Sequence, residues 1–399
     1  MSKQLWTCQA PIFLISPSFI TSSQYEFAFG VCNGQKTNLR SQGIVGFKLH
    51  HPDFSSGSAL ASSPTLITQT DLPRHLQSKE EWHNRHNPLT DMLWTCHSHS
   101  GQFCTHATSS LREVITAALS RGMTTICLTE HIPRHPAEFY PGEETHALVR
   151  HHGSLFALFD AYYAAAVALR SEFADRISVL IGFEGEWISA STTTIMRELR
   201  ERYDFDLFLG SNHHVGGVAI DFTVDEYGRA RDEVGGGSDE GLAEKYFDEQ
   251  LDMLKELRPP VVAHFDLVRL LADEGNRDRD WRGLGQLWWR VKRNLEFVKG
   301  YGGVLEVNAA ALRKGLEDVY PRREILEEWN AMGGRCTLSD DSHGVGQLCT
   351  NYGRALDCIS RAGIEALWCP VGGEKAQAPR LTWEMVPLTQ VRETLGQDT

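Results

Sequence analysis

The sequence of 399 residues predicts an α/β protein in which seven strand–helix units close into a TIM-like barrel. Three observations support this fold class. After residue 91, short apolar runs of strand length alternate with longer amphipathic stretches of helical period. The apolar runs are continuous, which is typical of parallel strands covered on both faces. Seven units approach the eight of a (β/α)8 barrel, whose active site lies at the carboxyl ends of its strands.

The seven predicted strands are short apolar runs, most of which lead directly into polar residues. They are "MLWTC" (92–96), "TTICLTE" (124–130), "ISVLIGFE" (177–184), "FDLFLGSN" (205–212), "PVVAHF" (260–265), "GGVLEVN" (302–308) and "RCTLSD" (335–340). Helical stretches separate them. The first, "SSLREVITAALSRG", has Thr108 or Ser109 as its candidate N-cap and Gly122 as its stop. The polar, glycine-rich stretch 225–241 is predicted to be a long loop on the active-site side.

Residues 1–90 differ in composition from the rest. They are rich in Ser, Thr, Gln and Asn and show no sustained period of 2 or 3.6. We therefore expect an N-terminal extension that is mostly disordered or loosely packed, with one short strand near 43–50, followed by a catalytic domain over 91–399. An alternative is that Met92 is the natural start and that the upstream stretch is an artefact of the gene model.

Composition narrows the class of substrate and the compartment. The net charge of −13 argues against a nucleic-acid partner, because binding to a phosphate backbone requires a basic face. No apolar run reaches the roughly 18–20 residues of a membrane helix, and "APIFLISPSFI" (10–20) lacks the basic start of a signal peptide. Nine cysteines without a framework pattern suit reduced thiols. These features predict a cytoplasmic protein with a small-molecule substrate and no membrane partner; they do not predict an oligomeric state.

Histidines and carboxylates gather where the predicted strands end. In chain order they are His97, His99 and His106; Glu130 and His131; Glu184 and Glu186; His213 and His214; His264 and Asp266; Glu306 and Asn308; and Asp340, Asp341 and His343. A barrel brings these ends around one axis. One histidine at a strand end is usually a hydrogen-bonded part of the scaffold, but this joint pattern is improbable by chance. Imidazole with carboxylate suits Zn, Mn or Fe, and a carboxylate can bridge two ions.

The opening cluster "WTCHSHSGQFCTH" (94–106) also allows a structural zinc site or a disulfide. A structural zinc site needs paired knuckles, and neither Cys96 nor Cys104 has a C-x-x-C partner. A disulfide is disfavoured by the expected compartment. Cys96 alternates with the His97 and His99 pair, so we expect its side chain to point away from the pocket. The cluster is therefore interpreted as part of a polynuclear catalytic site.

The set "HSH", "TEH", "GFE", "GSNHHV", "AHFD" and "SDDSH" resembles the polymerase-and-histidinol-phosphatase (PHP) family of metal phosphoesterases. Stretches such as "DLFLGSNHHVGGVAIDF" and "LEVNAAALRKGLEDVYP" look like the monofunctional histidinol-phosphate phosphatases of fungal type. The resemblance covers roughly residues 92–370. It implies a distorted seven-stranded barrel, two or three divalent ions (Zn, Mn or Fe), and hydrolysis of L-histidinol phosphate to L-histidinol and phosphate in histidine biosynthesis.

The resemblance also implies a ligand set. One ion would be held by His97, His99, Glu184 and Asp341; Glu184 would bridge to a second ion held by His213 and His264; and a third would be held by His106, His131 and His343. Glu184, Asp341 and His343 are expected to be catalytic. The neighbours His214 and Asp340 should point away or support the ligands from behind. The clearest departure is Thr95, where the family commonly has an Asp that orients a ligand.

Substrate contacts are predicted from chemistry and from the resemblance. Two ions clamp phosphate oxygens and lower the pKa of a water molecule, and Arg269 and Arg313 stand just beyond strand ends as candidate phosphate ligands. Glu130 could bind the substrate amine or only support a ring, and Glu186 and Asp221 are further candidates. Alternatives are a PHP-type phosphoesterase acting on nucleotides or other small esters, and a metal-holding domain without catalysis.

Overall fold

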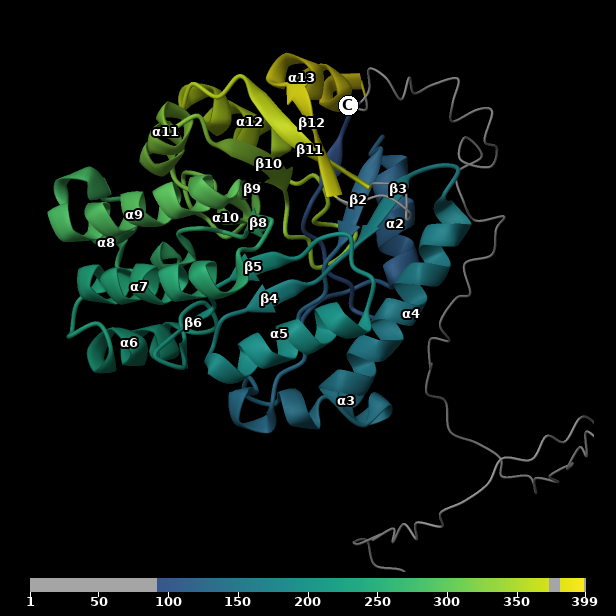
Figure 1. The fold of residues 1–399 in the computed structure, drawn as a ribbon, viewed down its shortest axis with the longest axis horizontal. Coiled ribbons are helices and arrows are strands. Elements are labelled where there is room, and N and C mark those ends of the chain that lie inside the picture. The colour runs from purple at the N-terminus through teal and green to yellow at the C-terminus, as the bar shows by residue number, and fades with distance from the viewer. Residues whose placement is uncertain (1–91, 373–380, 398–399) are drawn as a thin grey trace, which may run out of the picture. The chain divides into compact units, whose positions relative to one another are not determined.

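The computed structural model describes residues 92–372 and 381–397. The predicted N-terminal extension, with its expected strand near 43–50, lies outside the described residues. Figure 1 shows parallel strands at the centre with helices packed around them. No helix among the described residues is long and apolar enough to cross a membrane.

Two parallel sheets make up the barrel. The first has the order β1 (Trp94–Thr95), β2 (Thr125–Leu128) and β3 (Ser178–Ile181). The second has the order β10 (Arg335–Ser339), β9 (Val304–Asn308), β8 (Val261–Val262), β5 (Leu209–Ser211) and β4 (Glu184–Glu186). β3 and β4 follow each other within the third predicted strand region, so the seven predicted strand positions are all occupied.

Backbone contacts join the two sheets at two seams. At one seam the Ile132 N–H donates to the Glu184 carbonyl at 3.1 Å, beside a parallel bridge between His131 and Glu184. At the other, the Cys96 N–H donates to the Leu338 carbonyl at 3.1 Å, beside a parallel bridge between Ser98 and Ser342. The predicted seven-unit barrel is confirmed, and its distortion lies at these seams, where single bridges replace continuous ladders.

Helices follow the strands, as the alternating pattern predicts. They are α2 (Leu111–Ser120), α3 (Ala147–His152), α4 (Leu155–Phe173), α5 (Ala190–Arg202), α6 (Val224–Glu233), α7 (Asp239–Leu257), α8 (Glu274–Arg277), α9 (Gly285–Tyr301), α10 (Ala310–Arg313), α11 (Arg323–Ala331), α12 (Tyr352–Arg361) and α13 (Leu388–Gln397). The N-cap of α2 is Ser110 rather than Thr108 or Ser109, because Ser110 forms a capping box with Glu113.

The prediction of a long loop at 225–241 is wrong. Helix α6 begins after Thr223, and α7 begins after Ser238, each of which caps its helix through its side chain. Polar residues face solvent on α6 while Tyr227 and Ala230 are buried. Only the short glycine-containing link between the two helices fits the prediction.

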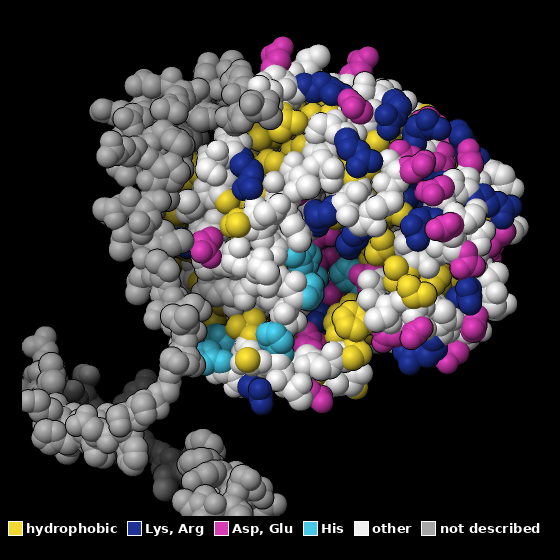
Figure 2. All heavy atoms as spheres, turned by 180° about the vertical axis from the view of Figure 1, so that it is seen from behind, with side chains coloured by type: hydrophobic (Ala, Val, Ile, Leu, Met, Phe, Trp, Pro, Cys, Tyr) yellow, Lys and Arg dark blue, Asp and Glu magenta, His cyan; other side chains and the backbone are white. Residues whose placement is uncertain are grey.

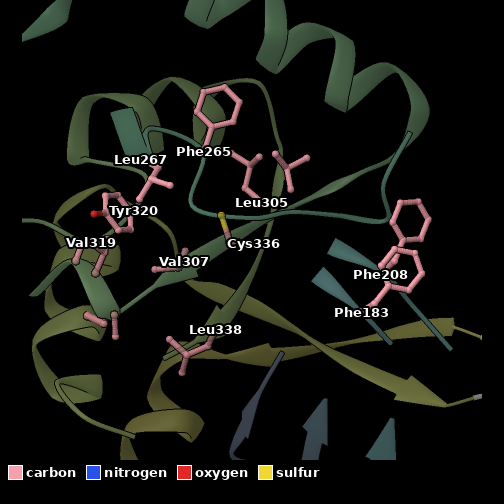
Figure 3. Close-up of a cluster of buried hydrophobic side chains, with 14 of the residues drawn as sticks. Phe183, Phe208, Phe265, Leu267, Leu305, Val307, Val319, Tyr320, Cys336 and Leu338 are labelled. Carbon is pink, nitrogen blue, oxygen red and sulfur yellow. The ribbon is translucent and has the colours of Figure 1, made fainter. Parts of the chain in front are cut away.

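Alternate residues of the strands face two different cores. Outward-facing side chains such as Leu305, Val307 and Leu338 belong to the core between strands and helices (Figure 3), where the rings of Phe183 and Phe208 stack at 5.3 Å. Inside the barrel lies a smaller apolar group, here called the interior cluster. It consists of Cys96, Cys127, Leu180, Leu207, Leu209, Val261 and Ala263.

Two hairpins complete the described fold. β11 (Ala366–Gly372) pairs antiparallel with β12 (Leu381–Pro387), and Leu381 and Trp383 of β12 pack against the interior cluster. β6 (His214–Val215) pairs with β7 (Val218–Ala219) directly after β5. The first hairpin thus covers the apolar part of the barrel, and the second extends the segment that follows His213.

Candidate metal centre

Histidine and carboxylate side chains from six strand ends and the loop after β1 converge in the structure. Three groups of His, Cys, Asp or Glu place their donor atoms within 4.8 Å of one another: His97, His99 and Glu184; His131, Glu184 and His213; and His99, Cys104, His131 and His343. On one face of the molecule, histidine, acidic and basic side chains line a hollow (Figure 2). All nine residues of the predicted ligand set are brought together through these groups or through direct contacts with them.

The first predicted set contains two histidines and two carboxylates. The Nε2 atoms of His97 and His99 lie 3.0 Å apart. The Glu184 Oε2 atom lies 3.3 Å from His97 Nε2 and 3.5 Å from His99 Nε2. Asp341 Oδ1 lies 3.7 and 3.5 Å from the same two nitrogens. Four donor atoms therefore point at one small volume.

The protonation of His97 follows from its other nitrogen. Its Nδ1 lies 2.7 Å from Glu306 Oε1, so that Nδ1 carries the proton and Nε2 presents a lone pair. The Nδ1 of His99 faces Glu130 Oε2 at 3.6 Å, beyond hydrogen-bond distance. Two lone pairs facing each other beside two carboxylates repel unless a cation lies between them. The arrangement therefore fits a divalent ion.

The second predicted set lies around the other oxygen of Glu184. Oε1 is 2.9 Å from His264 Nε2 and 3.2 Å from His213 Nε2, and these two nitrogens are 3.1 Å apart. His213 Nδ1 lies 3.0 Å from Glu186 Oε1, which again leaves Nε2 as the free lone pair. The two oxygens of one buried carboxylate thus face two separate donor groups, which is the geometry of a bridging ligand.

The third predicted set is the most open. The Nε2 atoms of His106 and His343 lie 3.1 Å apart, and His343 Nδ1 lies 3.1 Å from the Asp341 carbonyl. The His131 ring stacks on the His99 ring at 4.3 Å. His106 is exposed, whereas the side chains of His131 and His343 are 15% and 19% exposed. This side of the centre is therefore the one that faces solvent.

Cys104 was not among the predicted ligands, yet it lies in the same group. It is buried, and its Sγ lies 3.5 Å from both ring nitrogens of His106. From the sequence, Cys104 and Cys96 were candidates for a structural zinc site or a disulfide, and neither interpretation was favoured. Cys96 instead packs in the interior cluster. The spacing of Cys104 two residues before His106 was the signal that could have found it.

The buried carboxylate of Glu306 supports two of the histidines from behind. Glu306 accepts from the His97 ring, from Ser339 Oγ at 2.5 Å and from the His264 N–H at 2.6 Å. The sequence placed Glu306 at a strand end without assigning it this role. The strand-end position in "LEVN" was the available signal.

Two predicted substrate contacts have other partners. Glu130 accepts from the Ser100 N–H at 2.9 Å and the Ser100 hydroxyl at 2.6 Å, and it faces His99. Glu186 is fully buried and contacts Arg134 at 2.6 Å besides His131 and His213. The oxygens of Glu186 are thus occupied inside the protein, whereas Glu130 Oε2 faces His99 without a well-formed hydrogen bond. Both carboxylates lie beside the histidine rings, and their contact with the substrate stays a prediction.

The two predicted phosphate ligands differ. Arg269 is buried; its Nε donates to Asp266 at 2.8 Å and its Nη2 to the Asp318 and Val319 carbonyls. These bonds tie Arg269 to the protein itself, and its contact with phosphate stays a prediction. Arg313, in contrast, donates to the Asp340 and Asp341 carbonyls at 3.0 and 2.9 Å from a half-buried position. Its guanidinium therefore lies at the edge of the centre.

The neighbours of two predicted ligands point elsewhere. Asp340 accepts from the Cys349 N–H at 2.7 Å, the Ser342 N–H at 3.1 Å and the Thr95 hydroxyl at 3.2 Å. The His214 ring lies 5.3 Å from that of Tyr140 and belongs to none of the donor groups. Thr95 thus fixes the turn that carries Asp341, although it adds no charge.

The charges of the centre are strongly coupled. Burial by itself disfavours ionisation, yet the surrounding histidines hold the pKa of Glu184 and of Asp341 well below their usual range. For His99 and His213, burial lowers the pKa, but the neighbouring carboxylates outweigh it and raise the pKa to about 10. Burial lowers the pKa of His343 to about 4. In the absence of an ion the carboxylates are therefore paired with protonated rings, and a cation bound at the Nε2 atoms would displace those protons.

Unsatisfied polar atoms lie in the donor groups. Both ring nitrogens of His131 are buried without a hydrogen bond that satisfies distance and angle. Buried polar atoms are rarely left so, except where a ligand or ion completes them. The backbone is also strained here, since His264 and Asp341 have φ of +21° and +47°. These residues fit divalent ions bound by nitrogen and oxygen.

Comparisons with known proteins agree with this geometry. The PHP domain model matches residues 95–310. A Schizosaccharomyces pombe protein named probable histidinol-phosphatase is 38% identical over 271 residues, covering 68% of this chain and 87% of that protein. The Saccharomyces cerevisiae histidinol-phosphatase is 32% identical over 327 residues, covering 74% of this chain and 96% of that protein.

A solved structure shows the same fold. The histidinol phosphate phosphatase of Lactococcus lactis, solved in complex with Zn, L-histidinol and phosphate, superposes with a TM-score of 0.53 at 19% identity. The match covers 70% of this chain and 96% of that one. At this identity the likeness concerns the fold.

Proposed function

The chain belongs to the PHP domain family, and from this premise we propose that it is a metal-dependent phosphomonoesterase that hydrolyses L-histidinol phosphate to L-histidinol and phosphate. Two yeast relatives, matched over most of their length, carry the name of this activity. The observation that carries the chemistry is Glu184, whose two oxygens face His213 and His264 on one side and His97 and His99 on the other.

Two or three divalent ions complete this centre in our proposal, with Zn, Mn or Fe as candidates. Bound between such donors, divalent ions clamp phosphate oxygens and supply a nucleophile from water near neutral pH. The chain's own contribution is orientation. Glu306, Glu130 and Glu186 fix the rings of His97, His99 and His213, so that their lone pairs point inward. Glu184, Asp341 and His343 are the proposed catalytic residues.

Arg313 is the proposed phosphate ligand among the arginines. Its bonds to the carbonyls of Asp340 and Asp341 hold the guanidinium beside the donor groups. Lys314 adds positive charge near Asp341, since it contributes to lowering the pKa of that carboxyl. Together they offset the charge of a phosphate dianion.

The organic part of the substrate needs a carboxylate and an aromatic surface. Asp221 lies close enough to His213 for its charge to raise the pKa of that ring. Next to it, the exposed Phe222 contacts Tyr140 at a ring distance of 5.4 Å. We propose that Asp221 pairs with the substrate ammonium and that these rings contact its imidazole.

The proposal is tested by phosphate release from the purified full chain supplied with Zn or Mn. Histidinol phosphate is compared with nucleoside monophosphates and a generic aryl phosphate. A preference in kcat/KM of at least about a hundredfold for histidinol phosphate is expected, because the other esters carry no ammonium group and would leave Asp221 without its partner. In the cell we place this activity in the cytoplasm.

Two variants sharpen the test. Asp221→Asn should raise KM for histidinol phosphate while leaving turnover of the aryl phosphate unchanged, since only the former carries an ammonium. The exposed Glu296 on α9 offers a matched control, Glu296→Gln, which should change neither. If the native chain hydrolysed all esters equally slowly, the proposed substrate would be refuted, but the proposed metal centre would not.

A further inference from the structure

One nucleophilic side chain in the centre has no role in the proposed reaction. Cys104 is 4% exposed, and its Sγ lies within 4.8 Å of donor atoms of His99, His131 and His343. The same sulfur is 3.5 Å from each ring nitrogen of His106. A buried cysteine normally packs among apolar groups, whereas this one is surrounded by imidazoles.

The position of Cys104 is fixed by its loop. The Cys104 N–H donates to the Ser100 carbonyl at 2.8 Å, and the Thr108 N–H donates to the His343 carbonyl at 2.8 Å. Gly101 lies so close to this loop that a Cβ there would stand 2.7 Å from the Ala107 carbonyl and the Thr108 Cα. The loop is therefore folded tightly back, and it holds Cys104 against the strand ends.

The contrast with the other cysteines is informative. Seven cysteines lie among the described residues. Cys96 and Cys127 lie in the interior cluster beside Leu180 and Val261. None of these others belongs to a donor group in the described part of the chain. Among the cysteines that the structure describes, only Cys104 has the surroundings of a ligand.

A second observation points to an ion at the same place. His131 has both ring nitrogens buried and without a well-formed hydrogen bond, although it lies in the group that contains Cys104. A sulfur and a second imidazole, that of His343, complete a set of soft and borderline donors around one volume. Such a set suits zinc.

We propose that Cys104 is a thiolate ligand of the third ion, together with His131 and His343, with the exposed His106 on the outer side. On binding, the thiol loses its proton to solvent and the sulfur binds the metal. A thiolate favours Zn, Co or Cd over Mn and Mg. The inference rests on the metal-binding part of the proposed function and is independent of the substrate.

Substitution of cobalt for the native metal tests the proposed bond between the Cys104 sulfur and the ion. The full chain is stripped of metal by a chelator and reconstituted with Co(II), and its near-ultraviolet spectrum is recorded. The native chain should show a thiolate-to-cobalt charge-transfer band that Cys104→Ser lacks. The matched control is Cys349→Ser, at a half-buried cysteine outside every donor group, which should keep the band. A band that persists in Cys104→Ser would overturn the assignment.

X-ray absorption spectroscopy at the zinc edge is a second test, and it does not require that a variant folds correctly. The native zinc-loaded chain should show sulfur scattering at about 2.3 Å from zinc; only nitrogen and oxygen neighbours would overturn the proposal. In Cys104→Ser, the affinity of the third site for zinc, relative to its affinity for manganese, should fall by at least about tenfold. This is the smallest loss typical of removing a residue that only supports a ligand. Unchanged affinity would also overturn it. Failure to hydrolyse histidinol phosphate would affect neither result.

Discussion

The two ends of the barrel interior are built by the same strands but have opposite chemistry. β8 contributes Val261 and the following Ala263 to the interior cluster, and the next residue, His264, belongs to the metal centre. β2 likewise supplies Cys127 to the cluster and leads to His131 in the centre. Residues that pack in the apolar cluster and residues of the candidate metal centre are thus only one to four positions apart along the chain.

The energetic consequences of the two ends differ. Burial of apolar side chains in the interior cluster stabilises the fold by about 25 cal/mol per Å². In the metal centre, Glu184 and His97 are 1% and 0% exposed, and buried ionisable groups cost free energy unless they are paired. Strained backbone at His264 and Asp341 adds to that cost. The comparison teaches that burial at the apolar end stabilises the fold, whereas burial of ionisable groups at the other end costs free energy unless they are paired.

The largest expected effect is on Glu184, which faces both donor groups. Glu184→Gln should lower kcat/KM by about a thousandfold, because losing several kcal/mol of transition-state stabilisation costs a factor of ten per 1.36 kcal/mol. Metal content, measured by elemental analysis, should fall as well. Stability of the metal-free protein should be retained. A large loss of stability would show that the centre also holds the fold together.

The second-largest expected effect is on stability, and it follows from a substitution in the interior cluster. Leu180→Ala should lower the free energy of unfolding by about 2–5 kcal/mol, through lost burial and the cavity left behind. Leu180 is 3% exposed and packs only in that cluster. Urea denaturation measures the loss, and phosphate release should be unchanged under native conditions. A fall in kcat comparable to that of Glu184→Gln would break the separation of the two ends.

A smaller effect, on metal affinity, is expected for Glu306, which contacts the ring of the proposed ligand His97. Glu306→Gln keeps the shape but removes the charge that orients His97, and should weaken metal affinity by about 10–100-fold. Competition with a chelator measures this change. Glu296→Gln serves as the control at an exposed position. Equal affinities in the two variants would contradict the role of Glu306.

The smallest effect concerns Thr95, at the junction of the two ends. Thr95→Val removes the hydroxyl that donates to Asp340 and should cost about 1 kcal/mol of stability. Thr95→Ser should recover most of it, as thermal unfolding would show. If Val were as stable as Ser, the hydroxyl would have no part in fixing the turn that carries Asp341.

The fold could be predicted from the sequence because its signal is local. Each strand position followed from continuous apolar runs, and Gly122, with φ of +70°, lies just past α2 as expected. The stretch 225–241 was mispredicted as a loop because its many charged residues conceal the buried face of α6. The prediction gave more weight to the polar composition of this stretch than to its weak helical period.

The candidate ligands could also be named from the sequence, because strand ends in a barrel face one axis whatever lies between them. The sequence could not decide the tasks of residues that share a chemical type. Glu186 and Arg269 were expected to contact substrate, but only the folded chain places Arg134 against Glu186 and Asp266 against Arg269.

The sequence by itself determined the barrel, the gathering of histidines and carboxylates at its strand ends, and the resemblance that names the chemistry. Tertiary structure alone decided which carboxylate faces two donor groups, which one supports a histidine ring from behind, and that Cys104 lies among the imidazoles. The physical reason is that apolar period is a property of neighbouring residues, whereas donor geometry depends on contacts such as that between Glu184 and His264, 80 positions apart in the chain.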